Sequence, residues 1–180
     1  EEVAEAFNHL EQAGKVRHFG VSNQNPMMME LLKTAVKQPL KVNQLQLSAA
    51  FTPSFEAGFH VNMEGPKAAV RDGSVFEYCR LTDTVIQAWS VLQHGYFKGN
   101  FVGKEEFAAL NHVITDLAKK YQITPTAIAL AWVLRYPGKM QAVIGTTKPQ
   151  HVLEAGKAAE VNLTRKEWYQ IYLAAGNDLP

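Results

Sequence analysis

Residues 18–26, His18-Phe-Gly-Val-Ser-Asn-Gln-Asn-Pro26, place a short strand directly before the start of a helix. The apolar run at 18–22 predicts the strand. Asn25 followed by Pro26 predicts the helix, because Asn caps helix N-termini and Pro is favoured at the first helical position. Helical spacing of apolar residues continues this helix through Val36. A strand followed at once by a helix is the repeating unit of parallel α/β folds.

The same unit recurs three more times along the chain. Apolar or alternating runs predict the other strands at 42–48, 84–90 and 142–145. Residues 49–73 and 91–103 lack a period and carry Gly or Pro, which predicts two long loops. Periodicity and capping residues predict helices over residues 3–13, 74–81, 107–121 and 124–136, from 149 onward, and from a capping box at 164–167 to near 176. We therefore expect one α/β domain over residues 1–180, with parallel strands.

Small polar groups and one indole follow the predicted strands. They are Ser22 and Asn23, Gln44 and Ser48, Trp89 and Ser90, and the run Gly145-Thr146-Thr147. Ligands of parallel α/β folds bind at this edge of the sheet. No Asp, Glu, Lys, His or Tyr ends a predicted strand, so these groups suit binding of an amide-bearing or aromatic ligand better than proton transfer.

Each of these positions also has a plain structural interpretation. Ser22 and Asn23 fit a turn with helix caps, Trp89 fits a core position, and residues 145–147 fit an ordinary helix N-terminus. That last run equally fits a phosphate site, because backbone N–H groups and the helix dipole favour anions there.

The overall composition excludes several classes of protein. The chain has 180 residues, 47% of them hydrophobic, and a formal net charge of +1. Disorder is excluded by the apolar content, and the chain has no basic footprint for nucleic acid. No apolar run is long enough to span a membrane, and the acidic start is unlike a signal peptide. Cys79 is the only cysteine, which fits a reducing, cytoplasmic location, and we expect no metal site.

Four short motifs, in order, resemble those of one enzyme family. Gly20-Val-Ser-Asn23, Val42-Asn-Gln44, Ala88-Trp-Ser90 and Val143-Ile-Gly-Thr146 are similar to the fifth- to eighth-strand motifs of the aldo-keto reductases. The resemblance covers essentially all 180 residues. It implies a (β/α)8 TIM barrel of which only the second half, four parallel strands plus helices, is present. It also implies a nicotinamide cofactor bound in extended form.

The resemblance assigns cofactor-binding roles to particular residues. Ser22, Asn23 and Gln44 would bond the nicotinamide carboxamide, and Trp89 would stack on the nicotinamide ring. The resemblance places the rest of the cofactor against Ser90, Leu92 and Gln93 at the pyrophosphate, and Gly145, Thr147, His151 and Glu154 at the adenosine and its ribose phosphate.

Two departures from the family pattern concern the phosphates. His151 stands where many members carry Arg or Gln, and Asn100 stands where a Lys is common. An Arg binds phosphate through two parallel hydrogen bonds, so its loss weakens the selection for the ribose phosphate. The resemblance therefore implies NADPH as cofactor, with NADH not excluded.

The family's catalytic Asp, Tyr, Lys and His belong to the first four strands, which this chain lacks, and we assign no catalytic residue. The expected function is NAD(P)H-dependent reduction of a carbonyl substrate to an alcohol, with this chain as the cofactor-binding half and inactive alone. The alternative is a non-catalytic cofactor-binding subunit similar to the beta subunits of potassium channels, which share the fold and the Trp-Ser motif.

Overall fold

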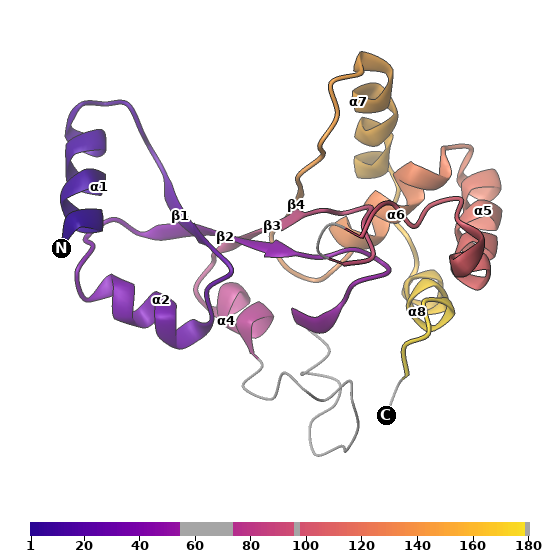
Figure 1. The fold of residues 1–180 in the computed structure, drawn as a ribbon, viewed down its shortest axis with the longest axis horizontal. Coiled ribbons are helices and arrows are strands. Elements are labelled where there is room, and N and C mark those ends of the chain that lie inside the picture. The colour runs from indigo at the N-terminus through magenta and orange to yellow at the C-terminus, as the bar shows by residue number, and fades with distance from the viewer. Residues whose placement is uncertain (55–73, 96–97, 179–180) are drawn as a thin grey trace.

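The computed structural model describes residues 1–54, 74–95 and 98–178, and four parallel strands form one sheet in this part of the chain (Figure 1). The strands are β1 (Phe19–Ser22), β2 (Leu40–Gln46), β3 (Val85–Trp89) and β4 (Met140–Ala142). Their spatial order is the order of the sequence, β1-β2-β3-β4. The predicted parallel α/β architecture is confirmed.

Helices connect and cover the strands in the predicted order, with two helices before β4. They are α1 (Glu2–Gln12), α2 (Pro26–Lys33), α4 (Val75–Leu81), α5 (Ala108–Tyr121), α6 (Pro125–Leu134), α7 (Pro149–Gly156) and α8 (Arg165–Ala174), with short 3-10 turns at Glu105–Phe107 and Lys157–Glu160. Most of the predicted loop at 49–73 lies outside the described residues.

The predicted helix signals have their expected structural roles. Asn25 Oδ1 accepts a hydrogen bond from the Met28 amide at 2.9 Å and caps α2, and Thr124 caps α6 in the same way. Thr164 and Glu167 form the predicted capping box of α8. Gly14 follows α1 with φ +66°, a left-handed conformation that favours glycine.

Three predicted boundaries are wrong by a few residues. β4 was expected at 142–145 but ends at Ala142; the Val143 amide still donates to Ala88 O at 2.8 Å. Pairing stops there because β3 ends at Trp89 and Ser90 turns away with φ +52°. β2 runs from Leu40 to Gln46 instead of from 42 to 48. α2 ends at Lys33 instead of near Val36. At this end of the helix the Thr34 hydroxyl donates a hydrogen bond to Leu31 O.

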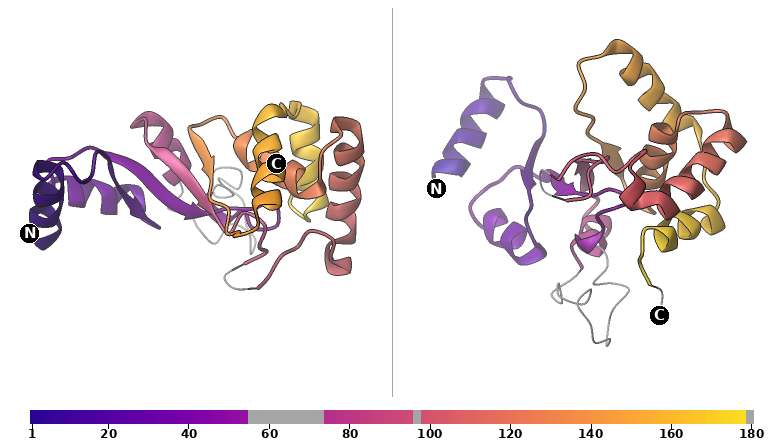
Figure 2. Two further views of the ribbon diagram at one scale, coloured as in Figure 1. Left: turned by 90° about the horizontal axis from the view of Figure 1, so that it is seen from above. Right: turned by 45° about the vertical axis from the view of Figure 1, so that its right-hand side comes forward.

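One large hydrophobic core lies between β2–β4 and the helices α4–α8 (Figure 2). Residues 127–133 of α6 are buried on every side, because this helix packs between β4 and the outer helices α5 and α7. Trp132 of α6 stacks on Trp168 of α8 with ring centroids 4.9 Å apart. Each indole N–H donates to the backbone carbonyl of the other tryptophan.

A much smaller core supports the other end of the sheet. Met29, Val36 and Leu40 are its buried members, and α1 and α2 cover it (Figure 2). Gly20 of β1 lies directly against β2. A Cβ atom at this position would lie 2.6 Å from Val42 Cβ and 2.7 Å from Val42 O, so close pairing of β1 with β2 requires glycine here.

Within the described ranges, no helix is both long and apolar enough to cross a membrane.

Candidate functional site

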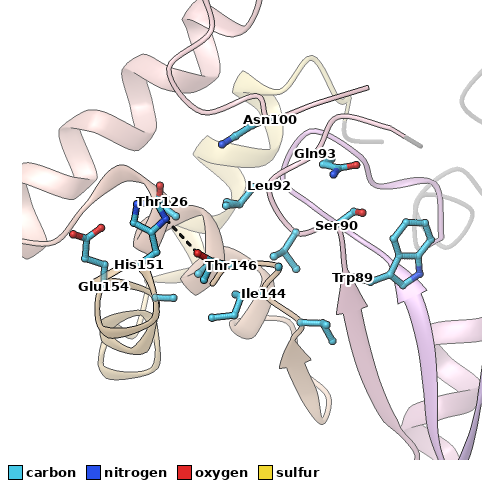
Figure 3. Close-up of a pocket in the computed structure, with 15 residues that line it drawn as sticks. Trp89, Ser90, Leu92, Gln93, Asn100, Thr126, Ile144, Thr146, His151 and Glu154 are labelled. Carbon is cyan, nitrogen blue, oxygen red and sulfur yellow. Dashed lines mark hydrogen bonds between the residues drawn. The ribbon is translucent and has the colours of Figure 1, made fainter. Parts of the chain in front are cut away.

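A pocket of about 520 Å³ opens at the carboxyl ends of β3 and β4 (Figure 3). Its walls come from the loops after these strands and from the helices α6 and α7. The structure brings these predicted site residues into it: Trp89, Ser90, Leu92, Gln93, Gly145, His151 and Glu154. Trp89 lies at one end of the pocket and Glu154 at the other, so the site is elongated.

The loop after β3 is held in a defined shape. Ser90 begins it with φ +52°, a left-handed conformation that is unfavourable for a residue with a Cβ atom. The Gln93 amide then donates to Ser90 O at 2.8 Å, and the Ser48 hydroxyl donates to Gln93 O. This backbone bonding places the Gln93 side chain in the pocket wall.

Gln93 carries an unused acceptor. Its Oε1 atom is buried and has no hydrogen-bond partner among the described residues. A buried acceptor without a donor costs free energy, so an N–H or O–H group of a ligand at this place would be stabilising.

The opposite end of the pocket lies at the N-terminus of α7. The Thr146 hydroxyl accepts from the Lys148 amide at 3.2 Å and lies 3.4 Å from His151 Nδ1. Glu154 accepts from Gln150 Nε2 at 3.0 Å. None of the described residues that line the pocket is Lys or Arg, so an anion at this end would be held by the helix N-terminus and His151.

The remaining predicted site residues lie outside the pocket. Thr147 is exposed, and Thr146 lines the wall in its place. Ser22, Asn23 and Gln44 form a separate polar group at the ends of β1 and β2. Asn23, with φ +53°, donates from its amide N–H to Gln44 O at 2.9 Å and from Nδ2 to Ser22 Oγ at 3.1 Å. The Ser22 hydroxyl donates to Gln44 O at 3.2 Å.

Sequence reasoning missed several residues at the site. Thr126 and Leu130 of α6 line the pocket, although nothing in the apolar pattern of that helix distinguishes them. Gln87 accepts a hydrogen bond from Gln44 and donates one to Gln141, so the three amides form a row across the sheet. The alternation Val85, Gln87, Trp89 was a usable signal, because it puts Gln87 on the same face as Trp89.

The pocket is equipped for binding more than for proton transfer. Its titratable lining residues within the described chain are His151 and Glu154, both at the end far from Trp89 (Figure 3). Cys79 is not available as a nucleophile, because it lies buried in α4 and burial raises the pKa of its thiol to about 11.

Comparison with known proteins adds a family to this geometry. The model of the aldo/keto reductase family matches residues 1–174. The chain is 32% identical to the oxidoreductase YdhF of Escherichia coli, over 100% of this chain and 54% of that protein. It is also 32% identical to a 6-dehydroglucose reductase of Agrobacterium fabrum, over 99% of this chain and 54% of that protein. The chain thus spans about half the length of the curated relatives it matches.

A solved structure gives the same fold. The thermostable aldo-keto reductase Tm1743, crystallised with the inhibitor epalrestat, superposes with a TM-score of 0.68 at 20% identity, over 95% of this chain and 53% of that one. The four parallel strands and their helices are therefore part of a (β/α)8 barrel, as the sequence motifs predicted.

Proposed function

The chain belongs to the aldo/keto reductase family, and we propose on that premise that residues 1–180 form the carboxy-terminal, cofactor-binding half of an enzyme that reduces aldehydes or ketones to alcohols. The observation that carries the proposal is the elongated pocket at the carboxyl ends of β3 and β4, with Trp89 at one end and the N-terminus of α7 at the other. An extended ligand with an aromatic head and an anionic tail fits such a pocket.

A nicotinamide cofactor matches the groups that are present. Ser22, Asn23 and Gln44 would hold the carboxamide, whose oxygen needs donors and whose NH₂ needs acceptors. Trp89 would stack on the ring, and Ser90 and Leu92 would lie along the pyrophosphate. The buried Gln93 Oε1 would accept from a cofactor hydroxyl or amide. The remaining adenosine contacts would come from Gly145, Thr147, His151 and Glu154.

The division of labour follows from the groups that line the described pocket. The bound cofactor would supply a hydride to the carbonyl carbon. Residues of this chain would orient the nicotinamide and shield one of its faces. The described pocket places no acid beside Trp89, so the proton for the developing alkoxide would come from groups other than the residues that line this pocket. We therefore propose that the chain binds cofactor but does not reduce carbonyls alone.

We propose NADPH as the preferred cofactor, with a modest margin over NADH. The N-terminus of α7 and His151 favour an additional phosphate on the ribose. Half-buried Glu154 opposes it by charge and would instead accept from a ribose hydroxyl. We also propose a cytoplasmic location, which the lone, buried and unbridged Cys79 supports.

Cofactor titration of the full chain tests the first part of this proposal. NADPH is expected to quench the fluorescence of Trp89, whereas Trp132 and Trp168 form a constant background because they are buried together. The Trp89→Phe variant is the matched control and is expected to lose the cofactor-dependent quenching. The proposal fails if neither NADPH nor NADH binds, as measured by calorimetry.

Complementation tests the second part. The chain is mixed or co-expressed with the portion of the Escherichia coli relative that it does not match, and aldehydes, ketones and oxidised sugars are assayed for NADPH oxidation. We expect turnover from the pair and none from either piece.

The channel-type regulatory alternative is not favoured, since the relatives above are named as an oxidoreductase and a reductase. Cofactor binding without turnover by the pair would support it.

A further inference from the structure

A row of glutamine side chains crosses the sheet beside the site. Gln44, Gln87 and Gln141, called here the glutamine row, occupy matching register positions on β2, β3 and β4. Gln44 Nε2 donates to Gln87 Oε1 at 3.2 Å, and Gln87 Nε2 donates to Gln141 Oε1 at 2.9 Å. Ser22 pairs with Gln44 in register, so polar contacts run across all four strands.

The glutamine row lies on the face of the sheet that is turned away from the main core. Its strand neighbours Leu45, Ile86 and Ala88 point the other way and are buried among the helices. Barrel interiors are usually filled by branched aliphatic residues. Gln44 and Gln87 are half-buried and Gln141 is exposed, so apolar packing does not account for three bonded amides together on this face.

We propose, resting on the proposed cofactor function, that Gln87 and Gln141 are positioning residues that fix the amide orientation of Gln44 for the nicotinamide carboxamide. An amide can rotate by 180° and exchange its donor and acceptor ends. The hydrogen bond to Gln87 engages the Nε2 end of Gln44. Its Oε1 end, which has no hydrogen bond among the described residues, is then the end that accepts from the ligand NH₂.

The orientations of the three amides are coupled through their donors and acceptors. Gln87 accepts from Gln44 with Oε1 because its own Nε2 is engaged by Gln141 Oε1. Rotation of Gln87 alone would put two donors face to face at Gln44 and two acceptors face to face at Gln141. Gln141 therefore acts on Gln44 only through Gln87, and its removal has the smaller effect.

Two substitutions at position 87 separate positioning from general structure. Gln87→Glu keeps an acceptor for Gln44 Nε2, whereas Gln87→Met removes it with a side chain of similar length. We expect Gln87→Met to weaken NADPH binding to the full chain by roughly three- to tenfold, the loss typical of one hydrogen bond. Gln87→Glu is expected to stay within about twofold of the unchanged chain, and Gln141→Met to lie between the two.

The control ligand is adenosine 2′,5′-bisphosphate, which lacks the nicotinamide. Calorimetry is expected to show the same affinity for it in every variant. The Gln170→Met variant, changed at an exposed position of α8, should bind both ligands with unchanged affinity. The inference is overturned if Gln87→Met weakens both ligands equally, if it weakens neither, or if Gln87→Glu loses as much NADPH affinity as Gln87→Met. Failure of the unchanged chain to bind either ligand overturns the proposed function, and this inference with it.

Discussion

The two ends of the sheet are supported in different ways. At the β3–β4 end, a continuous core extends through the helices α5, α6 and α8 and includes the stacked pair Trp132 and Trp168. At the β1 end, three buried residues, Met29, Val36 and Leu40, carry the packing of α1 and α2. Local stability follows the density of buried apolar contacts, so the β1 end is expected to open first.

The two ends of the sheet also carry different parts of the candidate site. The pocket with its buried Gln93 acceptor stands on the large core. The polar group Ser22, Asn23 and Gln44 lies at the weakly packed end. Hydrogen bonds between β1 and β2 hold its members together. The pocket end is thus held by apolar packing, whereas the β1 end is held mainly by hydrogen bonds.

Removing the largest buried side chain at the well-packed end should lower the stability of the whole fold. Trp132→Ala leaves a cavity beside Trp168 and removes the hydrogen bond from Trp132 Nε1 to Trp168 O. We expect the free energy of unfolding to fall by about 3–5 kcal/mol, measured by urea denaturation. Trp89→Phe is the matched control and should change it by less than about 1.5 kcal/mol. Equal losses in the two variants would show that the buried Trp132–Trp168 pair is no more important for stability than the half-buried Trp89.

The β1 end should respond with a local effect. Met29→Ala removes the central side chain of the small core, and we expect a loss of about 2 kcal/mol because few neighbours surround the cavity. Hydrogen exchange should accelerate in residues 1–36 and stay unchanged in α5, α6 and α8. Uniform acceleration throughout the described chain would mean that the two ends unfold as one unit.

The sequence predicted the elements that have local signals. Asn25 before Pro26 and the pair Thr164 and Glu167 mark helix starts by side-chain chemistry, and both are confirmed. The end of β4 was missed because no residue within 142–145 determines it. It depends on where β3, a distant segment, turns away at Ser90.

Part of the candidate site was predictable from the sequence. Trp89 was named from its place at a strand end, Gln93 and His151 were named from the family resemblance, and all three line the pocket. Thr126 of α6 was missed, because its position depends on how that buried helix packs against β4. The register that aligns Gln87 with Gln44 and Gln141 is likewise a property of the folded sheet, although alternation within β3 gives half of the signal.

Acid should weaken the well-packed end through Glu167. Burial raises the pKa of this carboxyl, but hydrogen bonds from Lys120 and Thr164 outweigh burial and hold the pKa at about 2. Tyr121 donates a further bond at 2.8 Å. Since the folded pKa lies below the ordinary 4.5, the stability from this group is present above pH 4.5 and is lost as pH falls toward 2.

Glu167→Gln tests this link between α5 and α8. The amide keeps the shape and part of the capping box but cannot ionise, so we expect a loss of about 1–2 kcal/mol at neutral pH. The difference between the two proteins should shrink between pH 4.5 and 2, as followed by urea midpoints at several pH values. A difference that is independent of pH would show that the charge of Glu167 contributes nothing.

The smallest expected effect is on cofactor affinity, which substitutions at the two ends of the site should change differently. His151→Arg adds a permanent charge and a fork of donors at the N-terminus of α7. We expect NADPH to bind about fivefold more tightly while NADH stays nearly unchanged, because only NADPH carries the additional phosphate. Ser22→Ala, at the other end of the site, should lower the affinity for both cofactors by the same factor, since both carry the same nicotinamide. Calorimetric titration of each variant with both cofactors gives the two ratios. If Ser22→Ala shifted the NADPH-to-NADH ratio, the assignment of phosphate recognition to the pocket and of carboxamide recognition to the β1 end would be wrong.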